Sequence, residues 1–242
     1  MEVKMLLDPH IHTQGISHCS RCPADVLVDT CVRDKIDAIV LTNHYKHDYY
    51  GEDSKFPEWR AKYIEEYFIT KEIGEKNGLK VFFGLEVTLD ENKRIDYVIY
   101  GLPETVAAEA PPLCLFTQKE LFEYCVAHNA LLYQAHPYRR GTLPQDPQYL
   151  HGVEINCHPV YNYNDAKEVR EFAKEHSLKL SCGSDYHGDT YKPHCGIYVP
   201  DDIKDTVELA EFLRRPEQCE LEVHDIFPDW REKYQRGQIL TK

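Results

Sequence analysis

Short apolar runs alternate with amphipathic stretches along this chain of 242 residues. The runs have the length of buried strands, and the stretches between them repeat apolar residues at helical intervals. The predicted strands are 4–7, 37–42, 79–87, 94–101, 130–135, 152–156, 178–182 and 196–199. The predicted helices are 24–34, 58–76, 118–129, 165–176 and 202–214. Because strands alternate with helices, the pattern predicts an α/β fold built on a parallel sheet.

Residues at the ends of these segments support the predicted boundaries. Pro23 suits the start of the first helix, and Gly78 follows the longest helix as a stop signal. Thr117 predicts an N-cap with Glu120 as its capping-box partner. Residues 90–93 predict a turn that makes the two strands around it hairpin partners. We expect loops at 45–59 and 102–115.

Side chains that bind metal ions stand near the ends of five of these strands. Asp8, His10 and His12 come first, and their spacing of two predicts that all three share one face of a strand. In a closed α/β barrel the carboxyl ends of the strands meet at one face, so residues far apart in sequence converge there. We expect eight side chains to meet in this way: His10, His12, His18, His44, Glu86, His136, Asp185 and His187. Histidine and acidic side chains are seldom buried unless paired or metal-bound, so the sequence predicts a multinuclear metal site.

Length, charge and cysteine content narrow the class of protein. A chain of this length forms a single barrel domain, which we expect to span residues 1–242. No apolar run is long enough for a membrane span, and the first residues do not resemble a signal peptide, so we expect a cytoplasmic protein. The formal charge of −13 argues against binding of long nucleic acids. Nine cysteines without regular spacing indicate reduced thiols, and the pair Cys19 and Cys22 is interpreted as incidental.

The ordered motifs resemble the PHP family, the polymerase and histidinol phosphatase domain phosphoesterases. They are DPHIHT, LTNH, GLE, AHP, GVEIN and GSDYH, they span residues 8 to 187, and His18 follows His12 by six residues. The resemblance implies a distorted seven-stranded, TIM-barrel-like β/α barrel. It also implies up to three metal ions at the carboxyl ends of the strands.

Carried over from the family, the ligands fall into three groups. The resemblance implies that the first ion is held by His10, His12, Glu86 and Asp185. Glu86 bridges to a second ion, which His136 also holds, and His18, His44 and His187 hold the third. Glu86, Asp185 and His187 are the candidate catalytic residues.

Two positions depart from the family's pattern. Asn43 stands where the family usually has an aspartate before the histidine of LTNH. Pro103 stands where many members place a further histidine ligand of the second ion. Asp96, Glu104 or solvent are the alternatives for that missing ligand.

The chemistry of such a site suits phosphate esters. Two divalent ions about 3.5–4 Å apart share a water molecule, lower its pKa and neutralise charge on phosphoryl oxygens. A mixed shell of imidazole and carboxylate suits zinc, manganese or iron(II), so two or three such ions are the expected cofactors. Arg139 and Arg140 are candidates for clamping a phosphate, because guanidinium binds its oxygens bidentately; a solvated surface pair is the alternative.

Other polar residues near the motifs have weaker indications. Glu154 and Asn156 are expected to brace the pocket rather than bind metal. Lys46, His47 and His158 lie near the ends of motifs. One interpretation is that they contact substrate, and the other is that they are surface residues.

The expected function is metal-dependent hydrolysis of a small phosphate monoester, such as a sugar, amino-alcohol or nucleotide phosphate. The alternatives are a phosphodiesterase or exonuclease, and a metal-stabilised PHP module without catalysis. The expected partner is therefore a small phosphorylated substrate, and neither a membrane nor a long nucleic acid. The sequence gives no indication of the oligomeric state.

Overall fold

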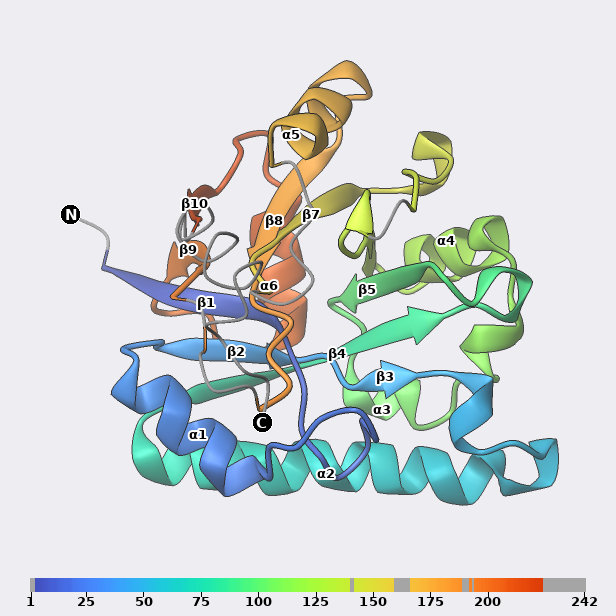
Figure 1. Cartoon of the computed structure of the whole chain (residues 1–242). Helices are drawn as coiled ribbons and strands as arrows, with labels where there is room; N and C mark the ends of the chain where they lie inside the picture. The colour runs from blue at the N-terminus through green and yellow to red at the C-terminus, as the bar shows by residue number, and fades with distance from the viewer. Residues whose placement is uncertain (1–2, 140–141, 159–165, 189–191, 193, 224–242) are drawn as a thin grey trace, which may run out of the picture.

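The computed structural model describes residues 3–139, 142–158, 166–188, 192 and 194–223. Ten strands among these residues form one curved sheet, and its neighbour order is β10-β9-β1-β2-β4-β5-β6-β7-β8, with β3 paired to β4 (Figure 1). The strands are β1 (Lys4–Ile11), β2 (Ala38–Leu41), β3 (His44–Tyr45), β4 (Lys80–Thr88), β5 (Asp96–Tyr100), β6 (Leu131–Gln134), β7 (Gly152–Asn156), β8 (Lys179–Gly183), β9 (Gly196–Pro200) and β10 (Glu220–Glu222).

The sheet is mixed rather than fully parallel. β1, β2, β3 and β4 pair in parallel, and so do β6, β7 and β8. β5 runs antiparallel to both of its neighbours, β4 and β6, and β9 runs antiparallel to β1 and β10. The carboxyl ends of most strands therefore meet at one edge, but β5 brings its first residue to that edge instead of its last.

The sheet almost closes into a barrel at this edge. The backbone N–H of Asp185, just past β8, donates to the carbonyl of His10 at 2.8 Å, and that of His12 donates to the carbonyl of Tyr186 at 3.1 Å. An isolated parallel bridge joins Ile11 to Tyr186. The predicted α/β, barrel-like class is confirmed. The expected count of seven strands is wrong, because short strands and the antiparallel β9 and β10 add to the sheet.

Within the described ranges, six α-helices surround or fill this sheet. They are α1 (Ala24–Arg33), α2 (Phe56–Asn77), α3 (Glu104–Ala107), α4 (Gln118–Ala127), α5 (Ala166–Glu175) and α6 (Thr206–Leu213). Pro57 lies in the first turn of α2, and Gly78 ends that helix in the left-handed conformation with φ of 79°. The predicted capping box of α4, between Thr117 and Glu120, is present.

Two apolar layers hold the barrel together. On the outer face, side chains of α1, α2, α4 and α5 pack against the sheet, with Trp59 and Leu121 among them. On the inner face, α6 packs against the early residues of the strands, where Leu209 meets Leu7 and Phe82 in one cluster. Figure 1 shows α6 inside the curve of the sheet, away from α1 and α2. The interior near the beginning of the strands is thus filled, and the opposite edge is left for polar groups.

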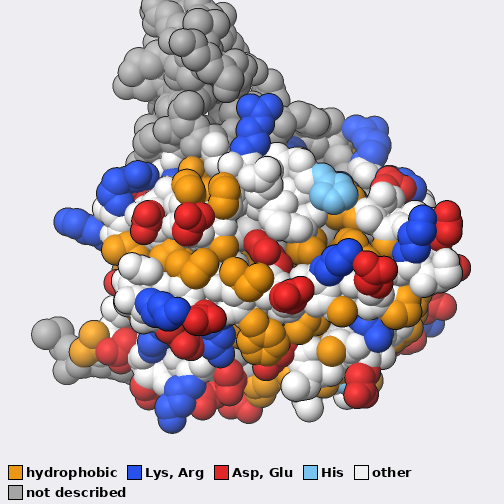
Figure 2. Space-filling view, turned by 90° about the horizontal axis from the view of Figure 1, so that it is seen from below, with side chains coloured by type: hydrophobic (Ala, Val, Ile, Leu, Met, Phe, Trp, Pro, Cys, Tyr) orange, Lys and Arg blue, Asp and Glu red, His pale blue; other side chains and the backbone are white. Residues whose placement is uncertain are grey.

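The surface and the cysteines complete the description of the fold. Figure 2, viewed from below, shows basic, acidic and hydrophobic side chains interspersed on one face of the molecule. All nine cysteines lie in the described part of the chain and are free thiols. Within the same residues, no helix combines the length and apolar character that crossing a membrane requires.

Candidate metal centre

The HxH motif lies at the end of β1, where the strand changes its pairing register. The register with β2 shifts between Asp8 and Ile11. Beyond this irregularity His10 and His12 both face the site, while the Asp8 carboxylate binds Ser184 and lies 2.8 Å from the Lys192 ammonium. The expectation that Asp8 joins the two histidines is therefore wrong, since the bulge separates it from them.

Four buried ligand atoms from three parts of the chain meet beside this motif. They are His10 Nε2, His12 Nε2, Glu86 Oε2 and Asp185 Oδ1, and among the described residues none of the four has a hydrogen-bond partner. Asp185 Oδ1 lies 3.4 Å from His10 Nε2 and 3.1 Å from His12 Nε2, and Glu86 Oε2 lies 3.4 Å from His12 Nε2. Ligands about 2.0–2.2 Å from one tetrahedral ion are separated by about 3.4 Å, so the spacing fits a shared divalent cation. Buried polar atoms left unpaired are otherwise costly.

Glu154 orients this group without joining it. Its Oε1 accepts from His10 Nδ1 at 2.8 Å, which directs Nε2 of the same ring toward Glu86 and Asp185. Its Oε2 accepts from the backbone N–H of His136 and from the Asn156 amide at 3.1 and 3.2 Å. The bracing arrangement expected for Glu154 and Asn156 is thus what the structure shows. A Cβ on Gly183 would lie 2.6 Å from that of His10, so only glycine fits there.

A second group of ligand atoms lies around the other oxygen of Glu86. Glu86 Oε1 is 3.0 Å from His136 Nε2, which is 3.7 Å from Asp96 Oδ2. Of the three alternatives for a missing ligand, the structure brings Asp96 to the cluster, because β5 is antiparallel and begins at this edge. Pro103 follows the far end of β5 as the N-cap of α3, and Glu104 lies within α3. The inferred equivalence of Pro103 with a ligand position is therefore wrong.

A third group joins His12, His44 and His187, whose ligand atoms lie within 4.8 Å of one another. His187 Nδ1 donates to the Asp185 carbonyl at 2.8 Å, which leaves its Nε2 facing His44 Nε2 at 3.4 Å. His18 does not join any of the described clusters. It is exposed, and its ring stacks on that of Tyr49 with centroids 4.2 Å apart, so the structure does not support its expected role as third-ion ligand.

Asn43 serves the site through the loop after β1. Its side-chain oxygen accepts from the backbone N–H of Thr13 and from the Ser17 hydroxyl, both at 2.8 Å. The Ser17 hydroxyl oxygen in turn lies 3.2 Å from His12 Nδ1 and accepts from the backbone N–H of His44 at 3.0 Å. Asn43 thus positions His12 and His44 through Ser17 without touching either ring. This is the role that Asn43 has at the position where the family usually has an aspartate.

Burial and opposite charges set the protonation of the cluster. Burial would raise the pKa of Glu86, but the charges of His44 and His10 hold it well below its usual range. Burial likewise would raise the pKa of Asp185, but His10 and Arg139 hold it low. Burial, with His187 and His44 nearby, lowers the pKa of His12, which leaves its ring neutral. Burial also opposes protonation of His44, yet Glu86 raises its pKa to about 10, so a cation that binds there must displace a proton.

Two candidate ligands sit on strained backbone. His136 follows β6 with φ of 32°, and Asp185 follows β8 with φ of 50°. A side chain larger than glycine rarely adopts positive φ, and such conformations cluster at sites where function requires them. The strain thus marks the same two positions that the ligand geometry selects.

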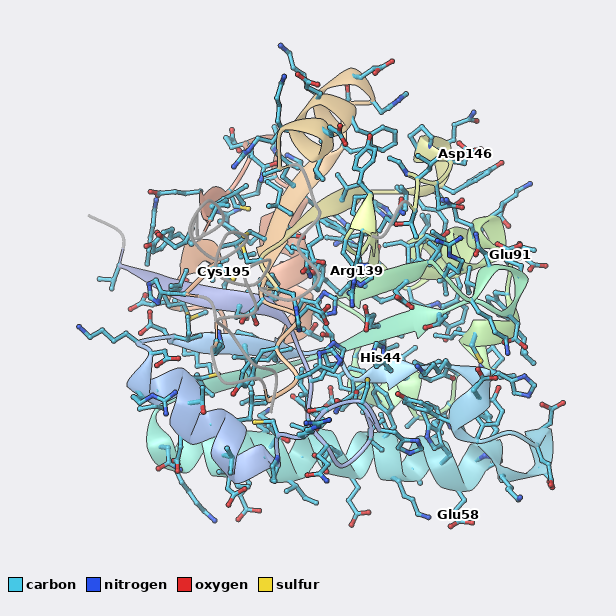
Figure 3. The ribbon with its side chains drawn as sticks, in the orientation of Figure 1. His44, Glu58, Glu91, Arg139, Asp146 and Cys195 are labelled. Carbon is cyan, nitrogen blue, oxygen red and sulfur yellow. The ribbon has the colours of Figure 1, made fainter. Side chains whose placement is uncertain are left out.

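Basic side chains surround the cluster on two sides. Arg139 Nη1 lies 2.7 Å from Asp185 Oδ2, so Arg139 contacts a candidate ligand directly, and the predicted Arg140 lies outside the described residues. Figure 3 shows His44 and Arg139 in the middle of the molecule, whereas Glu58, Glu91 and Asp146 lie at its periphery. A pocket of about 140 Å³ opens beside the second group of ligands and is lined by His44, Lys46, Asp48, Thr88, Asp90, Lys93 and Asp96.

The remaining candidates lie near this pocket or behind the cluster. His47 Nδ1 lies 2.8 Å from Asp90 Oδ2, at the rim of the pocket. His158 is buried, and its ring meets that of His187 edge to face at 6.1 Å. Sequence reasoning did not single out Lys93, whose only signal is its place in the turn before β5.

Comparisons with known proteins show what the fold resembles. No protein-family model matches the chain. No curated protein matches its sequence either. A two-domain protein from Bacteroides vulgatus, which contains a predicted PHP-like metal-dependent phosphoesterase, is 18% identical with a TM-score of 0.65, over 96% of this chain and 70% of its own. PsfC from Pseudomonas syringae is also 18% identical, with a TM-score of 0.67. The match covers 99% of this chain and 100% of PsfC.

A third solved structure is a proposed metal-dependent phosphoesterase from Bifidobacterium adolescentis. It is 15% identical with a TM-score of 0.51, and the match covers 88% of this chain and 97% of that one. The resemblance to PHP-like phosphoesterases is therefore confirmed at the level of the fold. At these identities, the assignment of an activity rests on the chain's own residues.

Proposed function

We propose that the chain is a metal-dependent hydrolase of small phosphate monoesters. The observation that carries the proposal is the meeting of four buried and unpaired ligand atoms, on His10, His12, Glu86 and Asp185. The likeness in fold to a protein described as a PHP-like phosphoesterase supports the choice of reaction. The acidic residues and neutral imidazoles match the ligands that zinc, manganese and iron(II) accept.

The described residues would hold at least two such ions around Glu86. His10, His12, Glu86 and Asp185 would hold one ion. Glu86 and Asp96 would hold a second, with His136 3.0 Å from Glu86 and 3.7 Å from Asp96. When bound, divalent ions acidify water and neutralise charge on phosphoryl oxygens. Glu154 fixes the His10 ring for this purpose, and Asn43 with Ser17 fixes the positions of His12 and His44.

The pocket beside Asp96 supports a small anionic substrate. Lys46 and Lys93 line it, and His44 and Asp96 place it against the cluster. Lys93 is paired with Asp48 at 2.7 Å, so the Lys46 ammonium would hold the substrate's phosphate, and Arg139 would stand on the other side beside Asp185. The pocket has a volume of about 140 Å³, and this small size favours a monoester over a polymer.

One assay separates this function from its alternatives. Protein stripped with a chelator and reloaded with Mn²⁺ or Zn²⁺ is offered p-nitrophenyl phosphate and its bis-ester. We expect hydrolysis of the monoester, lost on chelation and restored by the metal. Preference for the bis-ester would instead identify a phosphodiesterase. Bound metal without hydrolysis of either ester, or of a panel of phosphorylated metabolites, would identify a non-catalytic module. Less than one bound ion per chain after reloading would contradict the metal centre itself.

A further inference from the structure

We propose that Cys157, Cys182 and Cys195 bind one zinc ion, separate from the metal centre, that fastens the two ends of the sheet together. This inference goes beyond the proposed function and does not depend on it. The three thiols come from three segments, because Cys157 follows β7, Cys182 lies in β8, and Cys195 precedes β9. In Figure 3, Cys195 lies apart from His44 and Arg139, which mark the metal centre.

The three sulfur atoms lie close enough together to share one ion. The Sγ atoms of Cys157 and Cys182 are 3.5 Å apart, and the sulfur atoms of all three residues lie within 4.8 Å of one another. Sulfur ligands about 2.3 Å from one tetrahedral zinc ion are separated by about 3.8 Å. All three side chains are completely buried, and none is in a disulfide. A disulfide would use only two of these thiols, whereas one metal ion uses all three.

Burial of a thiol does not by itself indicate a metal site, because cysteine is often buried as a small apolar side chain. The gathering of three thiols distinguishes this group. Within the described ranges, the other four buried cysteines belong to no group of candidate ligands; they are Cys22, Cys31, Cys114 and Cys125. The groups at the metal centre contain imidazole and carboxylate and no sulfur. Thiolates select soft ions such as zinc, so the two sites differ in metal preference.

A fourth ligand is available in β10. The Cys182 thiol donates to the backbone carbonyl of Glu222, with the sulfur 3.3 Å from the oxygen. Loss of the thiol proton on metal binding removes this donor, and the zinc ion would replace it as the partner of the carbonyl oxygen. Three thiolates and one carbonyl fill the four positions of a tetrahedral ion and leave none for water. A closed shell of this kind is typical of a structural zinc site and not of a catalytic one.

The ion would lie where the two ends of the sheet approach each other. β8 and β10 stand at opposite ends of the strand order, and in the described part of the chain no ladder of backbone hydrogen bonds joins them. Cys182 belongs to one end, whereas Cys195 and Glu222 belong to the other. A zinc ion bound by all of them would cross-link the ends. Because these ligands gather only in the folded chain, the ion would stabilise the closed barrel.

Cadmium NMR tests this inference on the unaltered protein. Cadmium replaces zinc at thiolate sites, and its resonance moves far downfield when sulfur takes the place of nitrogen and oxygen ligands. Reduced, metal-free protein is loaded with an NMR-active cadmium isotope. We expect one downfield resonance, and its cadmium–proton correlations should lead to the β-protons of Cys157, Cys182 and Cys195. This measurement does not depend on the folding of any variant.

Four variants complete the assignment. Cys182→Ala and Cys195→Ala should each lose the downfield resonance. Cys125→Ala removes a buried thiol of α4 outside the group, and His12→Ala removes a candidate ligand of the metal centre; both should keep the resonance. A wild type without this resonance, correlations to other cysteines, or a resonance that persists in either of the first two variants would overturn the inference. Hydrolysis of phosphate monoesters by the same wild type would leave the proposed function standing.

Discussion

Glu86 contacts four histidines that three different segments bring to the site. Its Oε1 lies 3.0 Å from His136 Nε2 and 3.2 Å from His10 Nε2. Its Oε2 lies 2.5 Å from His44 Nδ1 and 3.4 Å from His12 Nε2. A single carboxylate thus stands between two groups of ligand atoms, so its charge affects every ion that either group holds.

Glu86→Gln tests this position at constant volume. The amide keeps the shape of the side chain but removes the charge shared by two ions, so turnover should fall by several orders of magnitude. Metal content and kcat/KM should be measured together across a Mn²⁺ titration. Full activity in this variant, or complete rescue by Mn²⁺, would show that Glu86 does not bridge.

Lys46 has a separate role in the proposed pocket. Its ammonium group lies over the Tyr49 ring, 4.4 Å from the centroid, and lines the pocket beside His44. Lys46→Ala should weaken kcat/KM by about tenfold, the size expected when one charge-assisted hydrogen bond to substrate is lost. Metal content should not change. Lys62→Ala, on the exposed face of α2, is the matched control and should match the wild type in both measurements.

At the scale of elements, the direction of β5 decides the second group of ligands. In a fully parallel barrel every strand brings its last residues to the active edge. β5 runs the other way between β4 and β6, so its first residue, Asp96, takes that place. Thr88, at the end of β4 that pairs with the start of β5, holds Asp96 in this place. Its hydroxyl donates to Asp96 Oδ1 at a distance of 2.5 Å.

Asp96→Ala should therefore weaken the affinity for one ion and leave the first group intact. High Mn²⁺ should restore part of the lost turnover, because Glu86 and His136 remain as ligands. The measurement is a metal titration followed by activity and by elemental analysis. Glu104→Ala in α3 is the control, and a stronger effect there than at position 96 would reverse the assignment.

The periodicity of the sequence predicts most elements but not their directions. Residues 152–156 were expected as a strand and form β7, and the Thr117 capping box begins α4 as expected. Residue types alone do not reveal that β5 is antiparallel, because the alternation of side chains is the same in both directions. The bulge in β1 and the turn around Ser17 also leave no periodic signal. The sequence therefore predicts Asp8 on the same face as the two histidines and His18 in the site, although the structure turns both away.

His151, just before β7, makes the stability of the fold depend on pH in the acid range. Its Nδ1 accepts from the backbone N–H of Leu132 at 3.0 Å, and burial, with the charge of Arg214, lowers its pKa from 6.5 to about 4. The unfolded chain therefore binds this proton more tightly than the folded chain. The stabilising contribution is complete above pH 6.5 and is lost as the pH falls from 6.5 through about 4.

His151→Asn keeps a side-chain acceptor but removes this titration. The free energy of unfolding of the wild type should therefore fall more steeply with acidification than that of the variant. The difference corresponds to uptake of about one proton. Urea unfolding of both proteins across this range of pH measures the difference in the free energy of unfolding. Parallel dependence of that free energy on pH in the two proteins would contradict the lowered pKa of His151.

At the scale of the whole molecule, the barrel is closed by polar contacts as much as by its apolar layers. The Asp8 carboxylate lies 2.8 Å from the Lys192 ammonium, and both side chains are completely buried. The same carboxylate accepts from the backbone and hydroxyl of Ser184. The Asp8 carboxylate thus joins β1 to Ser184 and Lys192, which both lie in the connection between β8 and β9.

Removal of one partner should leave the other charge buried and uncompensated. Asp8→Asn is expected to destabilise the fold by about 3–5 kcal/mol, the usual cost of breaking a buried ion pair. Combination with Lys192→Met should recover much of this loss, because no charge then remains buried. Chemical unfolding of the three proteins provides the test. Loss of the exposed pair between Glu58 and Lys62 is the control and should change nothing measurable.

Closure of the barrel between β1 and the residues after β8 has a consequence for the order of folding. His10 and Asp185 lie at opposite ends of the described core, and they become neighbours only when the segment after β8 pairs with β1. Contacts so distant along the chain form late, because a long loop must close first. A chain still in synthesis, without residues 183–187, lacks the Asp185 ligand of the first group, although β1 and β4 are already joined through β2. Binding of a cation at the first group would therefore stabilise the closed barrel more than any state in which this segment is not yet paired.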